Sequence, residues 1–365
     1  MKPRLRSQYF LLYEPPASSG EETLAIISER RTIELKGRFL REFTRHVVPL
    51  LDGRRDLGEI RAAVGDLFAP EDLDAALELL ARERLLEYVE DGARDAPESD
   101  RLGPQRNWLH ELGFETGDVS ERLAAARITV IGAGALGGSI AEALAASGVQ
   151  TLSIADHHIV REQDVYLAPV FASSDVGRLR VEALRDRIAA AAPRAAVACV
   201  SERPTNDSDV DAVTAGADFV VCAVDASDVA TAYRVNRACF ARSIPWIAAA
   251  ARGYEAIVGP TIEPRQTACF LCATMRMVAC ANDPYRAFAA QSFFDQQERD
   301  DSNRRENLTF GVGIAANLTA LEVFKRICGL PQTTVGSILV IDLLKASFER
   351  YVVLRKPDCP VCFAS

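Results

Sequence analysis

The C-terminal two thirds of the chain alternate between short apolar runs and longer amphipathic segments. Short apolar runs bounded by Gly, Pro or charged residues predict buried strands, and longer apolar-periodic segments predict helices. Strands and helices that alternate in this way are typical of a doubly wound α/β fold around a parallel sheet. The predicted strands are residues 127–131, 150–155, 195–200, 218–223 and 245–249, and the predicted helices lie near residues 136–147, 176–192 and 227–242.

The pattern changes after the last of these strands. Residues 254–262 predict an antiparallel extension of the sheet, and residues 337–342 and 348–354 predict two more strands. Residues 308–327 are rich in small residues and Leu, and they predict a helix. Residues 282–307 are polar and charged, so we expect a mobile crossover loop there.

The N-terminal part of the chain predicts a separate, small α+β module of the winged-helix type. Its predicted strands are residues 8–13, 24–27, 32–35 and 85–89, and its predicted helices are residues 39–51, 57–68 and 71–82. A stretch with charge, Pro and Gly but few apolar residues follows, which is typical of a linker. We therefore expect a module at residues 1–92, a linker at residues 93–105 and an α/β domain at residues 106–365.

The composition is that of an ordinary globular protein, with 48% hydrophobic and 25% charged residues in a chain of 365. The formal net charge of −9 argues against non-specific binding to nucleic acid or to a membrane surface. The sequence has no apolar run of about 18 residues and no cleavable signal peptide. Its nine cysteines indicate a reducing, cytoplasmic location.

Four of the cysteines form two Cys-x-x-Cys knuckles, Cys269 with Cys272 and Cys359 with Cys362. Four thiolates in two such pairs match the tetrahedral coordination of Zn²⁺. Because the four cysteines fill all the positions of a tetrahedral ion, we expect a closed, structural site. The alternative is four unrelated buried cysteines. Cys280 follows the first knuckle in polar surroundings and is either a reactive thiol or a bystander.

A glycine turn joins the first strand of the predicted sheet to a helix. Gly132, Gly134 and Gly137 have the spacing that lets a backbone approach phosphate closely at the start of a helix. Asp156 ends the next strand, where an acidic residue contacts a ribose hydroxyl in dinucleotide-binding folds. This order predicts a nucleotide site. The alternative is a tight turn that packs a helix on the sheet and binds nothing.

Residues 101–362 resemble the ThiF/MoeB family, the bacterial relatives of ubiquitin-activating enzymes. The features found in the family's order are the glycine turn, Asp156, Val176-Gly177, the strand end at residues 220–225, both cysteine knuckles and residues 106–114, which resemble its Arg-Gln-x-x-Leu-x-Gly-Phe segment. The family adenylates a C-terminal carboxylate with ATP and Mg²⁺, usually as a homodimer. The resemblance therefore implies a Rossmann-like fold with a zinc site and, in active members, an adenylyltransferase.

The resemblance also implies a role for single residues. Gly132, Gly134 and Gly137 would line the phosphates, Asp156 would hold the ribose, Asp225 would face Mg²⁺, Arg106 would reach into the partner subunit's site and Arg180 falls where the family has a lysine.

The chain departs from the family pattern at several charged positions. After Asp156 the family has Asn-Leu-x-Arg-Gln, whereas this chain has Asp164-Val-Tyr-Leu-Ala168. A carboxylate beside a triphosphate repels it, and an Arg replaces the charge of a Lys but not its geometry. The Asp-Asn pair of the family is also missing after Asp225, so Asp228 is an alternative partner for Mg²⁺. We therefore expect weak or absent nucleotide turnover.

Residues 8–89 resemble the PqqD-like winged helix, the leader-recognition module of peptide-modifying enzymes, in element order and in residues 50–60. A DNA-binding winged helix has the same outline, but the acidic balance of residues 69–91 lacks the basic footprint that DNA requires. An extended peptide could instead add a strand to the edge of the module's sheet. The predicted peptide contacts are Thr32, Ile33 and Leu35 on that edge and Leu73 and Leu77 on a groove wall.

A leader-binding winged helix joined to a ThiF-like domain is similar to partner proteins of thiazole/oxazole-modified peptide biosynthesis, including that of bacteriocins. This resemblance implies a homodimeric scaffold that binds the leader of a precursor peptide and presents it to a YcaO-type cyclodehydratase. The missing charged residues make this the leading hypothesis. The alternative is ATP-dependent adenylation of a carboxylate of the precursor peptide. A second alternative, activation of a sulfur-carrier protein, does not explain the N-terminal module.

Overall fold

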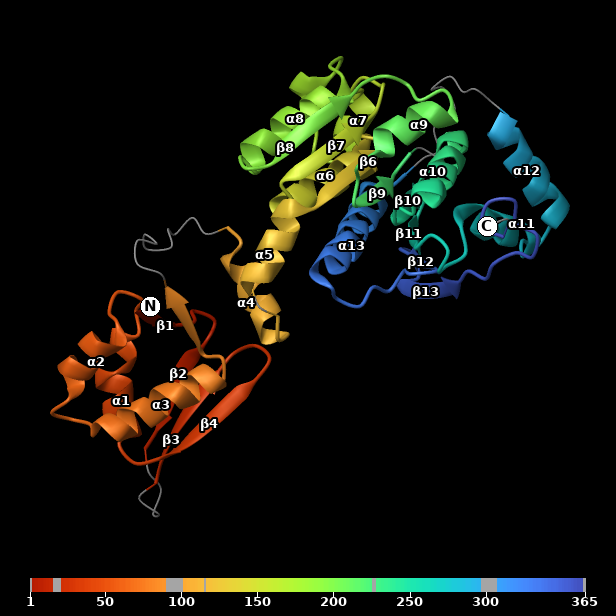
Figure 1. The fold of residues 1–365 in the computed structure, drawn as a ribbon. Coiled ribbons are helices and arrows are strands. Elements are labelled where there is room, and N and C mark those ends of the chain that lie inside the picture. The colour runs from red at the N-terminus through yellow and green to blue at the C-terminus, as the bar shows by residue number, and fades with distance from the viewer. Residues whose placement is uncertain are drawn as a thin grey trace. The chain divides into compact units, whose positions relative to one another are not determined.

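A computed structural model describes residues 2–15, 21–89, 101–114, 116–224, 228–296 and 307–363 (Figure 1). The chain forms two compact units, Met1–Thr116 and Gly117–Ser365. Helix α4 (Gly103–Glu111) belongs to the first unit, where Asn107 Nδ2 donates a hydrogen bond to Ser7 Oγ at 3.3 Å. The predicted domain limits at 92 and 105 stay a prediction. In the part of the chain that is described, no helix is both long and apolar enough to cross a membrane.

The first unit contains an antiparallel sheet of three strands in the order β2-β3-β4. A separate antiparallel pair joins the start of the chain to the end of the module. The strands are β1 (Lys2–Leu5), β2 (Phe10–Glu14), β3 (Glu22–Ile27), β4 (Thr32–Gly37) and β5 (Leu86–Val89). The helices before α4 are α1 (Leu40–His46), the short 3₁₀ helix η1 (Val48–Leu50), α2 (Leu57–Val64) and α3 (Pro70–Arg82).

One face of the three-stranded sheet packs on these helices. Leu24 and Ile26 of β3 are fully buried and share a core with Phe43, Ile60 and Leu80 of the helices. The predicted helix at residues 39–51 is broken into α1 and η1, because Pro49 has no backbone N–H to continue the helical hydrogen bonds. Strands in a small sheet packed on three helices agree with the predicted α+β module.

A sheet of eight strands forms the centre of the second unit, in the order β13-β12-β11-β10-β9-β6-β7-β8. Strands β6 to β10 run parallel, and β11, β12 and β13 extend the sheet antiparallel. The strands are β6 (Arg127–Ile131), β7 (Thr151–Ala155), β8 (Ala196–Val200), β9 (Phe219–Cys222), β10 (Trp246–Arg252), β11 (Glu255–Ile262), β12 (Ser337–Asp342) and β13 (Ser347–Val352).

Helices connect the parallel strands, as in a doubly wound fold (Figure 1). Each parallel crossover needs a connection of a dozen residues or so, and these helices supply it. Those between the parallel strands are α6 (Ala135–Ala146), α7 (Glu162–Leu167), the 3₁₀ helix η2 (Ser173–Asp175), α8 (Arg180–Ala191), α9 (Asp207–Thr214) and α10 (Val229–Arg242). Helix α5 (Thr116–Ala125) precedes β6, and α11 (Phe270–Ala279), α12 (Pro284–Gln296) and α13 (Thr309–Cys328) lie between β11 and β12.

The predicted α/β class and strand order along the chain are confirmed. The predicted helix at residues 176–192 begins only at Arg180, because Gly177 has a φ of 90° that a right-handed helix cannot contain. The predicted loop at residues 282–307 is wrong over α12, and residues 297–306 lie outside the described part. Periodicity alone did not reveal this helix, because its aromatic residues do not form a buried apolar stripe. Tyr285 and Phe288 are both exposed.

Candidate metal and nucleotide sites

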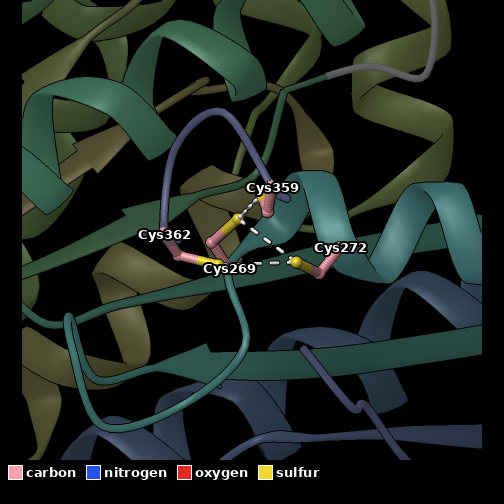
Figure 2. Close-up of side chains that lie close together, drawn as sticks. All are labelled: Cys269, Cys272, Cys359 and Cys362. Carbon is pink, nitrogen blue, oxygen red and sulfur yellow. Dashed lines mark hydrogen bonds between the residues drawn. The ribbon is translucent and has the colours of Figure 1, made fainter. Parts of the chain in front are cut away.

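The four cysteines of the two knuckles meet in one buried cluster. Cys269 is the N-cap residue of α11 and Cys272 lies in its first turn, while Cys359 and Cys362 follow β13 near the C-terminus (Figures 1 and 2). The Sγ atoms are 3.9 Å apart between Cys269 and Cys272, 3.7 Å between Cys269 and Cys359, and 3.5 Å between Cys272 and Cys362. Two segments ninety residues apart are thereby brought together.

These separations fit a tetrahedral zinc ion. Ligands about 2.3 Å from Zn²⁺ lie roughly 3.8 Å apart at the corners of a tetrahedron. A disulfide would need sulfur atoms about 2 Å apart, and all four cysteines are free thiols. Figure 2 shows the side chains pointing toward one another, so the donor set and its spacing suit a closed structural metal site.

Burial and hydrogen bonds act on these thiols in opposite directions. Burial raises the pKa of Cys269 to about 11. Burial also opposes ionisation of Cys359, but the backbone N–H groups of Cys362 and Val361 outweigh it and lower the Cys359 pKa to about 7. The backbone N–H of Lys356 donates to Cys272 Sγ at 3.3 Å. An ion that binds here therefore displaces protons and gains thiolates that backbone N–H groups already stabilise.

The predicted glycine turn lies at the carboxyl edge of the parallel sheet, between β6 and α6. Gly132 has a φ of 92°, and a Cβ there would lie 2.6 Å from the carbonyl oxygen of Ala223. A Cβ at Gly137 would overlap the Gly132 carbonyl oxygen. Gly134 is the N-cap residue of α6. Packing within the turn therefore already requires Gly132 and Gly137, whether or not a phosphate binds.

Asp156 follows β7 at the same edge of the sheet, and its side chain is engaged by the protein itself. Oδ2 accepts a hydrogen bond from the Ala133 N–H at 2.7 Å, and Oδ1 accepts from the N–H and from Nδ1 of His158, both at 2.8 Å. Burial alone would raise the pKa of Asp156, but the bonds from His158 and the positive Arg180 lower it to about 2. Asp156 is thus an ionised carboxylate with few acceptor positions left for a ribose.

Arg180 lies close to the glycine turn, with Nη1 3.6 Å from the position that a Cβ on Gly134 would take, but its charge is neutralised. Its guanidinium forms a bidentate pair with Asp164, with Nη2 2.8 Å from Oδ1 and Nε 3.1 Å from Oδ2. Nη1 lies 3.4 Å from Asp156 Oδ2. The side chains of Arg180 and Asp164 are only 3% and 5% exposed. Asp164, expected from the sequence to repel a triphosphate, instead pairs with the arginine that would attract one.

The structure brings the three glycines, Asp156 and Arg180 together, and it tests neither of the other two predicted nucleotide residues. Asp225 lies outside the described residues. Arg106 belongs to α4 of the first compact unit. Asp228, the alternative to Asp225, caps α10 by accepting hydrogen bonds from the Thr231 hydroxyl and N–H.

The predicted peptide contacts divide into two groups. Thr32, Ile33 and Leu35 lie on β4, an edge strand of the three-stranded sheet, with Thr32 exposed and the other two half-buried. Leu73 and Leu77 are only 2% and 6% exposed and belong to the core. Their predicted position on a groove wall is corrected: the apolar stripe of α3 faces inward, so it packs the helix against the sheet.

The two histidines that follow Asp156 were not among the site residues predicted from the sequence. His158 bonds Asp156 directly, and the rings of His157 and His158 lie 3.9 Å apart. The signal in the sequence is that two histidines directly follow the aspartate that was predicted to bind a ribose.

Residues 105–361 match the model of the ThiF family. The sulfur carrier protein ThiS adenylyltransferase of Escherichia coli K12 is 27% identical over 249 residues, which cover 68% of this chain and 90% of that protein. Protein HesA, heterocyst, of Trichormus variabilis is 29% identical over 245 residues, which cover 66% of this chain and 82% of its own.

Solved structures of similar fold cover both compact units. The microcin C7 biosynthetic enzyme MccB in complex with N-formylated MccA superposes with a TM-score of 0.68 at 18% identity, over 99% of this chain and 100% of that one. E. coli MccB with ATP gives a TM-score of 0.66 at 17% identity, over 99% of each chain. PaaA gives a TM-score of 0.66 at 18% identity, over 96% of this chain and 99% of its own. At this identity the likeness concerns the fold alone.

Proposed function

This chain belongs to the ThiF family, and from that premise we propose that it is a leader-peptide-binding partner protein in the biosynthesis of a ribosomally made, modified peptide. The observation that supports this proposal most strongly is that the charged side chains beside the glycine turn bind one another. Arg180 is held by Asp164 and Asp156, and Asp156 is held by Ala133 and His158. The glycine turn of the family is present, but the charged groups that would act on a triphosphate are paired with one another.

The cost of freeing these groups supports a loss of adenylation. A nucleotide that recruited Arg180 would have to break a buried bidentate pair and leave Asp164 as an unpaired buried carboxylate. Removing one partner of such a pair costs about 3–5 kcal/mol. A phosphate bound at the start of α6 would also lie near the negative Asp164 and Asp156. Weak or absent ATP turnover follows from both effects.

The first compact unit supplies the recognition role in this proposal. Strand β4 is at the edge of its sheet, and an extended peptide can pair with such an edge through backbone hydrogen bonds. The exposed Thr32 and Lys36 are on that strand. Support also comes from the fold, because the MccB likeness extends over 99% of this chain, whereas the matches to adenylyltransferases of sulfur-carrier pathways cover about two thirds of it.

In the proposed pathway, the chain acts as a homodimer that binds the leader and presents the rest of the precursor to a YcaO-type cyclodehydratase. Thiazoline and oxazoline formation would then occur on the partner enzyme. The ThiF-type domain would serve as a scaffold stabilised by Zn²⁺ at Cys269, Cys272, Cys359 and Cys362.

Leader binding is tested on the two compact units and the full chain. We expect residues 1–116 to bind a fluorescent cognate leader within about threefold of the full-chain affinity, and residues 117–365 not to bind it. Circular dichroism checks that each piece is folded. In the full chain, Lys36→Glu should weaken binding of an acidic leader, with the exposed Lys345→Glu of the second unit as its control. A folded N-terminal piece without affinity for a leader that binds the full chain contradicts the assignment.

A second function is favoured by the surviving glycine turn and by the relatives. If a precursor peptide displaces the internal pairs, the chain could adenylate a carboxylate of that peptide, as an ATP-dependent adenylyltransferase. ATP-pyrophosphate exchange that depends on the precursor would select this function. Activation of a sulfur carrier is less favoured, because it assigns no role to the first compact unit.

A further inference from the structure

Two arginines tie the two cysteine knuckles together through backbone oxygens. Arg276 lies in α11, four residues after Cys272, and therefore on the same face of that helix. Its Nε donates a hydrogen bond to the carbonyl oxygen of Leu354 at 2.6 Å, and its Nη2 donates to that of Arg355 at 3.0 Å. One side chain on the helix of the first knuckle thereby holds the segment that leads to the second knuckle.

The second arginine reaches in the opposite direction. Arg355 follows β13, and its Nε donates to the carbonyl oxygen of Thr267 at 3.1 Å. Its Nη2 also donates to the carbonyl oxygen of Arg265. Both oxygens belong to the loop after β11 that leads to Cys269. The two arginines therefore cross between the segments, and each holds the backbone of the other segment.

These bonds act beyond the end of the sheet. Strand β13 ends at Val352, and residues 353–358 connect it to Cys359. Within this connection, the backbone N–H of Lys356 donates to Cys272 Sγ at 3.3 Å. Hydrogen bonds donated by a guanidinium are stronger than those between neutral groups, because the donor is charged. The connection is thus held beside α11 by contacts that do not involve a metal ion.

We propose that Arg276 and Arg355 are positioning residues of the zinc site, which hold the second knuckle beside the first whether or not the ion is bound. The two knuckles are ninety residues apart in the chain, and bringing them together costs conformational entropy. Where the protein's own hydrogen bonds already order both segments, the ion binds a preformed site and is held there more tightly. This role rests on the zinc site of the proposed function and does not depend on leader binding.

The proposed role requires the geometry of the guanidinium and not its charge alone. A planar guanidinium can donate to two carbonyl oxygens at once from fixed directions, whereas the ammonium group of a lysine is a point charge on a flexible chain. Four thiolates around Zn²⁺ leave a net negative charge, which either cation would offset. Replacement of Arg276 by Lys therefore separates the effect of geometry from that of charge.

The role is tested by the rate at which the zinc-loaded full chain releases Zn²⁺ to an excess of a chromogenic chelator. We expect Arg276→Gln, Arg276→Lys and Arg355→Gln each to release zinc at least about fivefold faster than the wild type, somewhat less than the effect of replacing a residue that bonds a metal ligand directly. The matched control is Arg187→Gln, because Arg187 lies on α8 and pairs with Glu142 there. This variant should release zinc at the wild-type rate.

A second measurement separates local undocking from a general loss of stability. In the zinc-loaded chain, hydrogen exchange should become faster in residues 353–363 of Arg276→Gln and stay unchanged in β6, an internal strand of the sheet. If the wild-type chain contains no zinc, the metal site itself fails and this role fails with it. If zinc is present, the role is overturned when either Gln variant releases it less than about fivefold faster than the wild type. Release from Arg276→Lys at the wild-type rate, or equally accelerated exchange in β6, also overturns it.

Discussion

The cysteine cluster and the glycine-turn region are both built from family motifs, yet they differ in what their reactive groups contact. The four Sγ atoms lie 3.5–3.9 Å apart in the measured pairs, with no ion-pairing side chain among them. At the glycine turn, Asp156, Arg180 and Asp164 already form a closed set of ion pairs. The first region has its donors directed at a common centre, and the second has its charges directed at one another.

This difference shows that the spacing of a motif does not by itself establish the function of its residues. The cysteine spacing can place four ligands around one ion, and no other use of four converging thiols is visible in the structure described. The glycine spacing is fully explained by close packing at Gly132 and Gly137. The fold can therefore require a glycine turn whether or not a nucleotide binds, while a structural zinc site that loses one of its four protein ligands holds the metal less tightly.

The largest expected effect is the loss of folding stability when one cysteine of the cluster is replaced. Cys359→Ser should release the metal and lower the free energy of unfolding by several kcal/mol, because structural zinc contributes its binding energy to folding. Elemental analysis should find about one zinc fewer per chain, and the melting temperature should fall. Cys280→Ser, at an exposed thiol, is the control and should change neither. Unchanged melting of Cys359→Ser would refute a structural zinc site.

The next effect concerns the closed set of charges. Asp164→Asn restores the residue type of the family but leaves the Arg180 guanidinium without its bidentate partner. We expect a loss of about 3 kcal/mol in urea unfolding, as for a buried pair that loses one member. Asp207→Asn removes the carboxylate of an equally bidentate but exposed pair with Arg237 and should cost less than about 1 kcal/mol. Equal losses in the two variants would contradict the account.

A smaller effect is expected at acid pH. Asp156 has its pKa lowered from 3.8 to about 2, so its stabilisation is complete above pH 4 and is lost as the pH falls toward 2. Linkage gives about 1.5 kcal/mol lost between pH 5 and pH 2.5. In Asp156→Asn this share of the pH dependence should vanish. Urea unfolding at the two pH values measures it, and an identical pH dependence in both proteins would exclude Asp156 as its source.

The sequence predicted the strands and the cysteine site well because both depend on local patterns. Apolar runs located β6, β7 and β9 to within a residue or so, and the doublet spacing identified the four cysteines that come together in one cluster. The pairing of Arg180 with Asp164 was not predictable, because it depends on how α7 and α8 are placed at the sheet edge. Leu73 and Leu77 were assigned to a surface because an apolar stripe does not show which of its neighbours covers it.

The central claim is that the charges at the glycine turn are engaged with one another and do not act on ATP. Its most direct test is ATP-pyrophosphate exchange by the zinc-loaded full chain with its cognate precursor peptide, with E. coli molybdopterin-synthase adenylyltransferase, 24% identical over 250 residues, as the positive control with its own substrate. We predict exchange at the background level, with and without the peptide. Robust exchange that depends on the peptide and disappears in Asp225→Ala would contradict the account and establish adenylation.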